Sequence, residues 1–199
     1  MARNIFKALV SRRPKIVIGE LPPPQRTPAD IPTEAAPELA RGERVLAVAQ
    51  EDTSGRWLVL TTFRLLERSS EGLTLLERFW HEGDTGTWDP DLWMLSVSFT
   101  DGLNGRQWQL KTQTGPGDVP QVLRERTTAT VVLMRQVALG PRRPARVTIR
   151  KDLSNRELFE DVILSRGART DDAELMAAID RARADLRNQA GLPPATDAR

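Results

Sequence analysis

The sequence contains no cysteine, no tyrosine and a single histidine, His81. Without cysteine the chain can form neither a disulfide framework nor a thiolate metal site. No apolar run approaches the roughly 20 residues that span a bilayer. The first residues lack the apolar core and the small-residue cleavage site of a signal peptide. We therefore expect a cytoplasmic protein, which a partner could bring to the inner face of the membrane.

A strong charge of one sign is also absent, because the formal net charge is only +2. Residues 1–19 carry five basic groups and no acid, so the other 180 residues hold 24 basic and 27 acidic groups, a net charge of −3. Such a body does not attract a phosphate backbone. The five tryptophans, spread over residues 57–108, are interpreted as core residues rather than as base-stacking platforms. Nucleic acid is not an expected partner.

The sequence offers little for catalysis. His81 is the only histidine available for a dyad or triad, and its polar neighbours include no nucleophile on a sharp strand-to-helix turn. We interpret it as a surface-loop residue. Asp84, Asp89 and Asp91 lie close in sequence, but their spacing does not match an EF-hand loop. We predict no enzyme, no cofactor and no metal.

The pattern of residues divides the chain into four parts. Residues 1–19 form a basic, amphipathic N-terminal arm, and residues 20–41 are a proline-rich segment that we expect to be an extended, flexible linker. Residues 42–190 form the body, and residues 191–199 are expected to be a disordered tail.

The body is predicted to be α+β and mainly β. Short alternating segments separated by turn sequences fill residues 43–113, and Asp118 and Pro120 mark the start of a helix. Residues 127–139 fit either helix or strand because they are rich in β-branched side chains. A β-hairpin is predicted from residues 145–151 and 158–165. An amphipathic helix over residues 171–189 follows, with Leu175, Ile179, Ala182 and Leu186 on one stripe.

Two segments carry a resemblance to a known family. Gly42-Glu-Arg-Val-Leu-Ala-Val and Trp57-Leu-Val-Leu-Thr-Thr-Phe-Arg64-Leu-Leu resemble the opening of bacterial pleckstrin-homology-like domains, and the whole chain resembles an uncharacterised actinobacterial group. The resemblance implies a barrel of about seven antiparallel strands capped by a helix, here followed by the C-terminal hairpin and helix. That fold hosts lipid, peptide and protein binding alike, so it implies no particular activity and no site residue.

The N-terminal arm is the main candidate binding site. Its apolar residues share one helical face and two arginines follow them; the predicted partner-binding residues are Ile5, Phe6, Leu9, Val10, Arg12 and Arg13. Such a peptide can dock in the groove of a protein partner, lie on an anionic membrane or remain a disordered tail. We favour the protein partner, because four apolar anchors bind weakly to a membrane by themselves.

Secondary candidates lie in the body. Trp88 is in the acidic loop, and a stretch without acids contains Arg142, Arg143, Arg146 and Arg150. These arginines could bind an acidic partner, but we favour their neutralisation by Glu157, Glu160 and Asp161 across the hairpin. We therefore predict a non-catalytic adaptor or accessory subunit that binds a larger protein or complex through its arm. The alternative is a peripheral membrane module that binds anionic lipid through the arm and the arginine patch.

Overall fold

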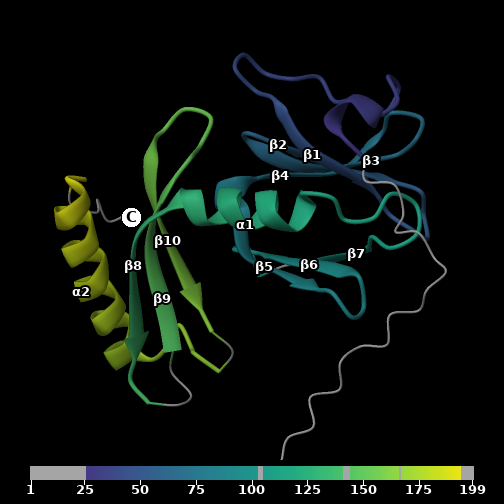
Figure 1. Ribbon diagram of the computed structural model, residues 1–199. Helices are drawn as coiled ribbons and strands as arrows, with labels where there is room; N and C mark the ends of the chain where they lie inside the picture. The colour runs from purple at the N-terminus through teal and green to yellow at the C-terminus, as the bar shows by residue number, and fades with distance from the viewer. Residues whose placement is uncertain (1–25, 103–104, 141–143, 166, 194–199) are drawn as a thin grey trace, which may run out of the picture.

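The computed structural model describes residues 26–102, 105–140, 144–165 and 167–193. The fold is α+β and mainly β, with three antiparallel sheets and two α-helices. We call the sheets A (β1–β4), B (β5–β7) and C (β8–β10). Sheets A and B and helix α1 form the first module, and sheet C with helix α2 forms the second (Figure 1).

The first three strands of sheet A are buried on both faces, whereas the fourth is largely exposed. Its strands are β1 (Val45–Gln50), β2 (Trp57–Thr61), β3 (Arg64–Arg68) and β4 (Thr74–Phe79), joined in that order. Leu58, Leu60 and Leu65 belong to the main core, whereas Val59 and Leu66 belong to a separate cluster. The alternation of side chains along each strand separates these two sets. Burial of both faces explains why every residue of β2 is buried.

Part of residues 20–41, the segment interpreted as a linker, covers the second face of sheet A. Its described residues, 26–41, include a short 3-10 helix, η1 (Pro28–Asp30), and Ala35 is completely buried with Val48 and Trp57. The guanidinium of Arg68 donates to the carbonyls of Ala35 and Ala36 at 2.9 and 3.2 Å. These contacts hold residues 31–36 against sheet A, whereas we expected an extended, flexible segment.

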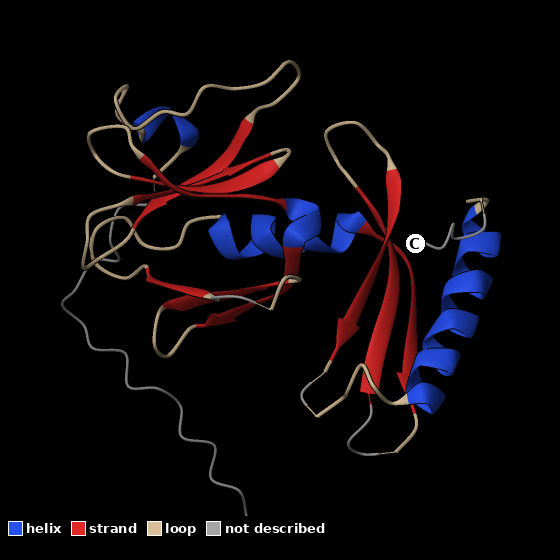
Figure 2. Cartoon of the chain, turned by 180° about the vertical axis from the view of Figure 1, so that it is seen from behind, coloured by secondary structure: helices blue, strands red, loops and turns tan. Residues whose placement is uncertain are grey.

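Sheet B contains β5 (Gly83–Asp89), β6 (Met94–Phe99) and β7 (Arg106–Gln109). Helix α1 (Val119–Thr130) packs against β5 and β1, and Figures 1 and 2 show it between sheets A and B. Gly86 makes this close approach possible, because a Cβ there would lie 2.7 Å from Cδ2 of Leu123. The main core therefore lies between sheets A and B and helix α1.

The predicted closed barrel is wrong. In the described ranges, sheets A and B remain separate sheets, and a bond from Asp52 N to Gln109 O at 2.9 Å links the β1–β2 turn to β7. On the other side the short helix η2 (Trp80–Glu82) separates β4 from β5. Trp80 is 2% exposed and donates its indole N–H to Thr61 O, so a large ring occupies the place between the two sheets.

The ambiguous residues 127–139 contain both structures. Helix α1 ends at Thr130 and β8 (Val131–Ala138) follows directly. With β9 (Pro144–Lys151) and β10 (Leu158–Leu164), β8 forms a three-stranded sheet where we predicted only a hairpin. The threonines at the end of α1 bond their hydroxyls to carbonyls of the preceding turn, which is compatible with helix despite their branching.

Helix α2 (Ala173–Ala190) covers one face of sheet C. Asp172 caps its N-terminus by accepting from Leu175 N, and Gly191 ends it in the left-handed conformation with φ +69°. The predicted stripe is the buried face: Leu175, Ile179, Ala182 and Leu186 pack with Val147 and Ile149 of β9. This second core is separate from that of the first module.

Candidate functional site

The principal predicted site lies outside the described residues. This applies to all six arm positions, Ile5, Phe6, Leu9, Val10, Arg12 and Arg13, and to Arg142 and Arg143 of the arginine patch. The candidates that can be placed are Trp88, Arg146 and Arg150.

Arg150 points into the junction between the two modules. It is 2% exposed, and its Nη1 donates to Gly83 O at 3.0 Å and to Thr130 Oγ1 at 3.2 Å. Its Nε lies 3.2 Å from Asp161 Oδ2 on the neighbouring strand. Burial lowers the pKa of Arg150, and the charge of Asp161 opposes that shift. Arg150 is therefore a structural cation that fastens sheet C to the first module.

Arg146 contributes to the same junction. It lies on the same face of β9 as Arg150, opposite Val147 and Ile149, and pairs with Asp84 of β5. Of the three acids expected to neutralise the patch, Asp161 pairs with Arg150, whereas Glu160 pairs with Arg183 and Arg187 of helix α2. Neither placed arginine is free to bind an external anion.

The turn between β9 and β10 docks onto the first module. Leu153 packs against the main core, and Asp152 Oδ1 lies 3.8 Å from His81 Nδ1. The His81 ring stacks with Phe79 at 5.7 Å and meets Phe159 of β10 edge-on at 4.9 Å. His81 is therefore a half-buried packing residue of the junction, not a residue of an exposed loop. Sequence reasoning missed this because its partners lie about 70 residues downstream.

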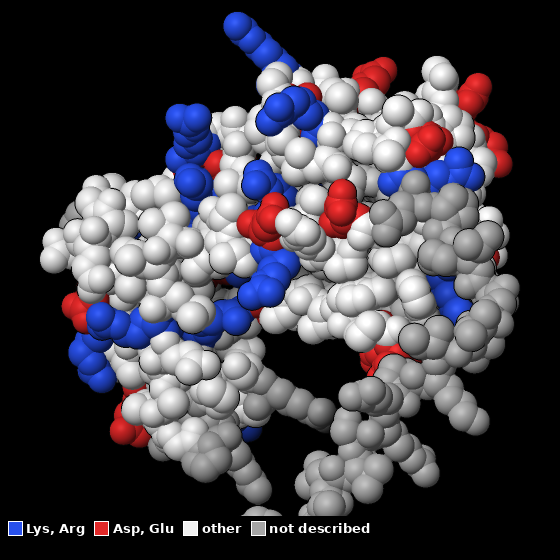
Figure 3. Space-filling model, viewed as in Figure 1, with Lys and Arg blue, Asp and Glu red and all other residues white. Residues whose placement is uncertain are grey.

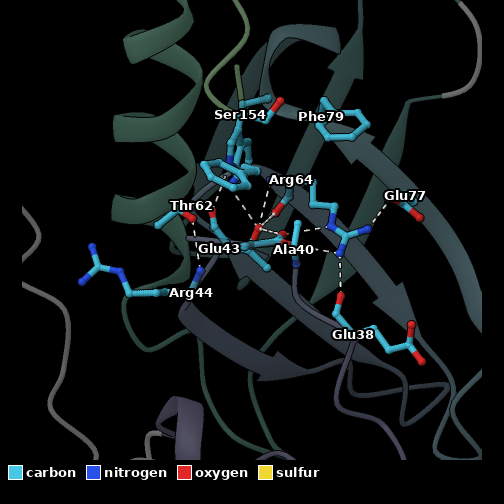
Figure 4. A network of polar contacts seen from close by, with 12 residues as sticks. Glu38, Ala40, Glu43, Arg44, Thr62, Arg64, Glu77, Phe79 and Ser154 are labelled. Carbon is cyan, nitrogen blue, oxygen red and sulfur yellow. Dashed lines mark hydrogen bonds and ion pairs between the residues drawn. The ribbon is translucent and has the colours of Figure 1, made fainter. Parts of the chain in front are cut away.

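The motif residues that carried the family resemblance meet in one polar network (Figure 4). The Glu43 carboxylate accepts from Arg64 Nε at 2.9 Å and Nη2 at 3.0 Å, from Thr61 Oγ1 at 2.6 Å and from Ala40 N at 2.8 Å. Burial raises the pKa of Glu43, but the bonds from Arg64, Thr61 and Ala40 outweigh it and hold the pKa below its ordinary value. With its oxygens engaged by these four donors, this carboxylate ties the chain just before β1 to β2 and β3.

The acidic segment, residues 84–91, is not a loop, since its residues up to Asp89 lie in β5 and Asp84 pairs with Arg146. Asp89 Oδ1 accepts from the backbone N–H groups of Asp91 and Leu92, at 2.9 and 3.1 Å. In the described part of the chain, no group of three or more acidic, histidine or cysteine side chains is placed to hold a metal ion. Trp88 is half-buried against the main core and meets Trp93 edge-on at 6.3 Å, so it too serves packing.

A shallow depression of about 340 Å³ lies on the outer face of sheet B. Its lining is rich in hydroxyl groups, which pair with their neighbours: Thr85 Oγ1 lies 2.6 Å from Ser98 Oγ, and Gln107 Nε2 donates to Ser96 Oγ. These neutral groups could contact a flat polar surface. They carry no feature that activates a nucleophile.

The surface gives a further view of the basic residues. On the face shown in Figure 3, Lys and Arg are interspersed with Asp and Glu, and a band of basic side chains crosses the second module toward the junction. Arg135, Arg183 and Arg187 of the second module are each paired with an acid. The band is therefore partly neutralised.

No family model, no curated protein and no solved structure matches the chain. Within the ranges that the structure describes, no helix combines the length and the apolar character needed to cross a bilayer.

Proposed function

We propose that this protein is a non-catalytic adaptor or accessory subunit that binds a larger protein or complex, with residues 1–19 as its docking peptide. The observation that carries the proposal is the combination of a basic, acid-free peptide with four apolar anchors and a body to which its base is fixed. A peptide of this composition binds a complementary groove through its apolar face, and its charges set orientation and association rate.

The base of the arm has a defined place. Residues 31–36 are packed on sheet A, and the chain from Arg26 to Pro28 lies beside β1 and the start of α1, next to Leu46, Ala47, Gly117 and Asp118. Only residues 20–25 separate this point from the arm, and they include three successive prolines.

We further propose that the first module is pleckstrin-homology-like. Its seven antiparallel strands followed by a helix agree in number and order with what the resemblance implies, although the two sheets do not close into a barrel. In this reading the module is a scaffold. The polar groups that a catalytic site would need, His81, Glu43 and Asp84, are engaged in packing or pairing.

The geometry favours a protein partner over an anionic membrane. The membrane reading needs the arm and the arginine patch to face lipid together, but Arg146 and Arg150 both point into the junction. Because these two arginines do not face outward, the arm is the principal basic element that could contact lipid. We expect the full-length protein to remain in the supernatant when it is sedimented with vesicles containing anionic lipid.

The test is affinity capture from the native lysate with the immobilised full-length chain. The double variant Phe6→Ala/Leu9→Ala should lose the captured partner, and a synthetic peptide of residues 1–19 should elute it from the unchanged chain. The matched control replaces two exposed leucines of the body, Leu73→Ala/Leu92→Ala, and should capture normally. Capture that survives deletion of residues 1–19 would exclude the arm.

A further inference from the structure

Strand β8 is an edge strand that the described molecule leaves open. It is the terminal strand of sheet C, with β9 as its hydrogen-bonded neighbour on one side. Val131, Val132 and Met134 are 38%, 43% and 57% exposed, so three of its large apolar side chains are open to solvent. Its eight residues also make it longer than any strand of the first module.

The usual protection of an edge strand is weak here. Proteins block such edges with charged side chains, prolines or very short strands, because the outward backbone groups are ready to pair with another strand. From Val131 to Ala138 there is no proline, and the one charged side chain, Arg135, is paired with Asp185 of α2. A long edge whose exposed large side chains are apolar, and whose one charged side chain is already paired, is a site for strand pairing.

We propose that β8 pairs antiparallel with β8 of a second copy of this chain, so that two C sheets join into one six-stranded sheet across a two-fold axis near Met134. An isologous contact of this type needs a strand that complements itself. Around that axis Met134 faces its own counterpart, and Val132 faces Gln136. The exposed side chains of Val132 and Met134 then become buried between the copies.

Helix α2 fits this arrangement. It lies over β8 and β9, and neighbouring strands are about 4.8 Å apart. The two α2 helices would therefore be separated by about two strand spacings, roughly 10 Å, which is at the upper end of the usual helix–helix packing distance. The same symmetry brings together Arg135 and Asp185 of each copy, which are 41% and 58% exposed. Two positive and two negative charges then alternate at the centre of the interface.

The inference goes beyond the proposed function and does not depend on the arm. It is tested by sedimentation velocity of the full-length chain over a range of concentrations. The unchanged chain should sediment as a dimer. Met134→Lys should weaken the dimer about tenfold or more, because two lysines would face each other across the axis. Leu92→Lys is the matched control, since Leu92 is 60% exposed in the first module, and it should remain dimeric.

A second measurement locates the axis. The chain contains no cysteine, so Met134→Cys introduces a single thiol. Directly opposed residues of antiparallel strands have Cα atoms about 4.5–5.5 Å apart, within the range of a disulfide. Met134→Cys should therefore form a covalent dimer on mild oxidation, and Leu92→Cys should not. A monomeric unchanged chain at all concentrations, or a dimer that tolerates both Met134→Lys and Val132→Lys, overturns the proposal.

Discussion

Replacing Glu43 by glutamine should destabilise the first module although the side chain keeps its shape. The carboxylate is 1% exposed and accepts two bonds from Arg64, one from Thr61 and one from Ala40 N. Glu43→Gln retains one acceptor oxygen and turns an amide NH₂ toward one of these donors. Hydrogen bonds to charged groups contribute about 1.5–3 kcal/mol each, and breaking a buried pair costs about 3–5 kcal/mol.

The expected loss is smaller than that upper limit. Arg64 is 17% exposed and keeps two other partners, Glu77 Oε1 and the carbonyl of Glu38. We therefore expect Glu43→Gln to lower the free energy of unfolding by about 2–3 kcal/mol at neutral pH. Urea unfolding followed by tryptophan fluorescence measures it, and buried Trp80, bonded to Thr61 O, reports from the same region. Exposed Glu71→Gln is the control and should leave the midpoint unchanged.

The pH dependence of this loss is fixed by the pKa of Glu43, which the hydrogen bonds hold below its ordinary value despite burial. A lowered folded-state pKa gives stability that is fully present above the unfolded pKa, about 4.3, and that disappears as pH falls through the folded value. The difference between the unchanged chain and Glu43→Gln should thus be constant near neutrality and shrink in acid. A difference that grows below pH 4, or a neutral-pH loss under about 0.5 kcal/mol, would refute the reasoning.

Three further changes test the packing of the two modules. Leu186→Asp places a charge in the second core, where Leu186 is 3% exposed, and should prevent folding of that module or lower the thermal midpoint by several degrees or more. Arg150→Ala leaves Asp161 with its charge unpaired in the junction and should cost about 3 kcal/mol in urea, whereas exposed Arg106→Ala should cost nothing measurable. Gly86→Val places a side chain against Leu123 and should cost about 1–3 kcal/mol; an unchanged midpoint would mean that α1 does not press on β5.

Local patterns predicted the elements that depend on neighbouring residues. The stripe of α2 is contained in fewer than 20 residues, and its buried face is the predicted one, although the helix begins at Ala173 with Asp172 as its cap. The strands of sheet A follow from alternation and turn sequences in the same way. Residues 127–139 stayed ambiguous because the change from helix to strand falls within a run of β-branched residues, between Thr130 and Val131.

Contacts between distant segments could not be predicted. Sheets A and B remain apart because Trp80 and the turn of η2 come between β4 and β5, which no alternation reveals. Arg146 points inward because Asp84 is present on β5, 62 residues away. Alternation along β9 separates the arginines from Val147 and Ile149, but it does not reveal what the arginine face meets.

The family resemblance and the functional question concern different residues. Gly42 adopts φ +80°, a left-handed conformation that glycine tolerates, and it leads directly into Glu43. Thr61 and Arg64 then bond Glu43 from the neighbouring hairpin, with Thr61 Oγ1 also accepting from Arg64 N at 3.0 Å. These side chains point toward one another rather than toward solvent (Figure 4). Any chain that builds this hairpin in this way requires them, whatever it binds, so the motif identifies how the strands are joined. Partner choice must then come from groups that the fold leaves unused, and the arm and the edge of β8 are the two such places that we propose.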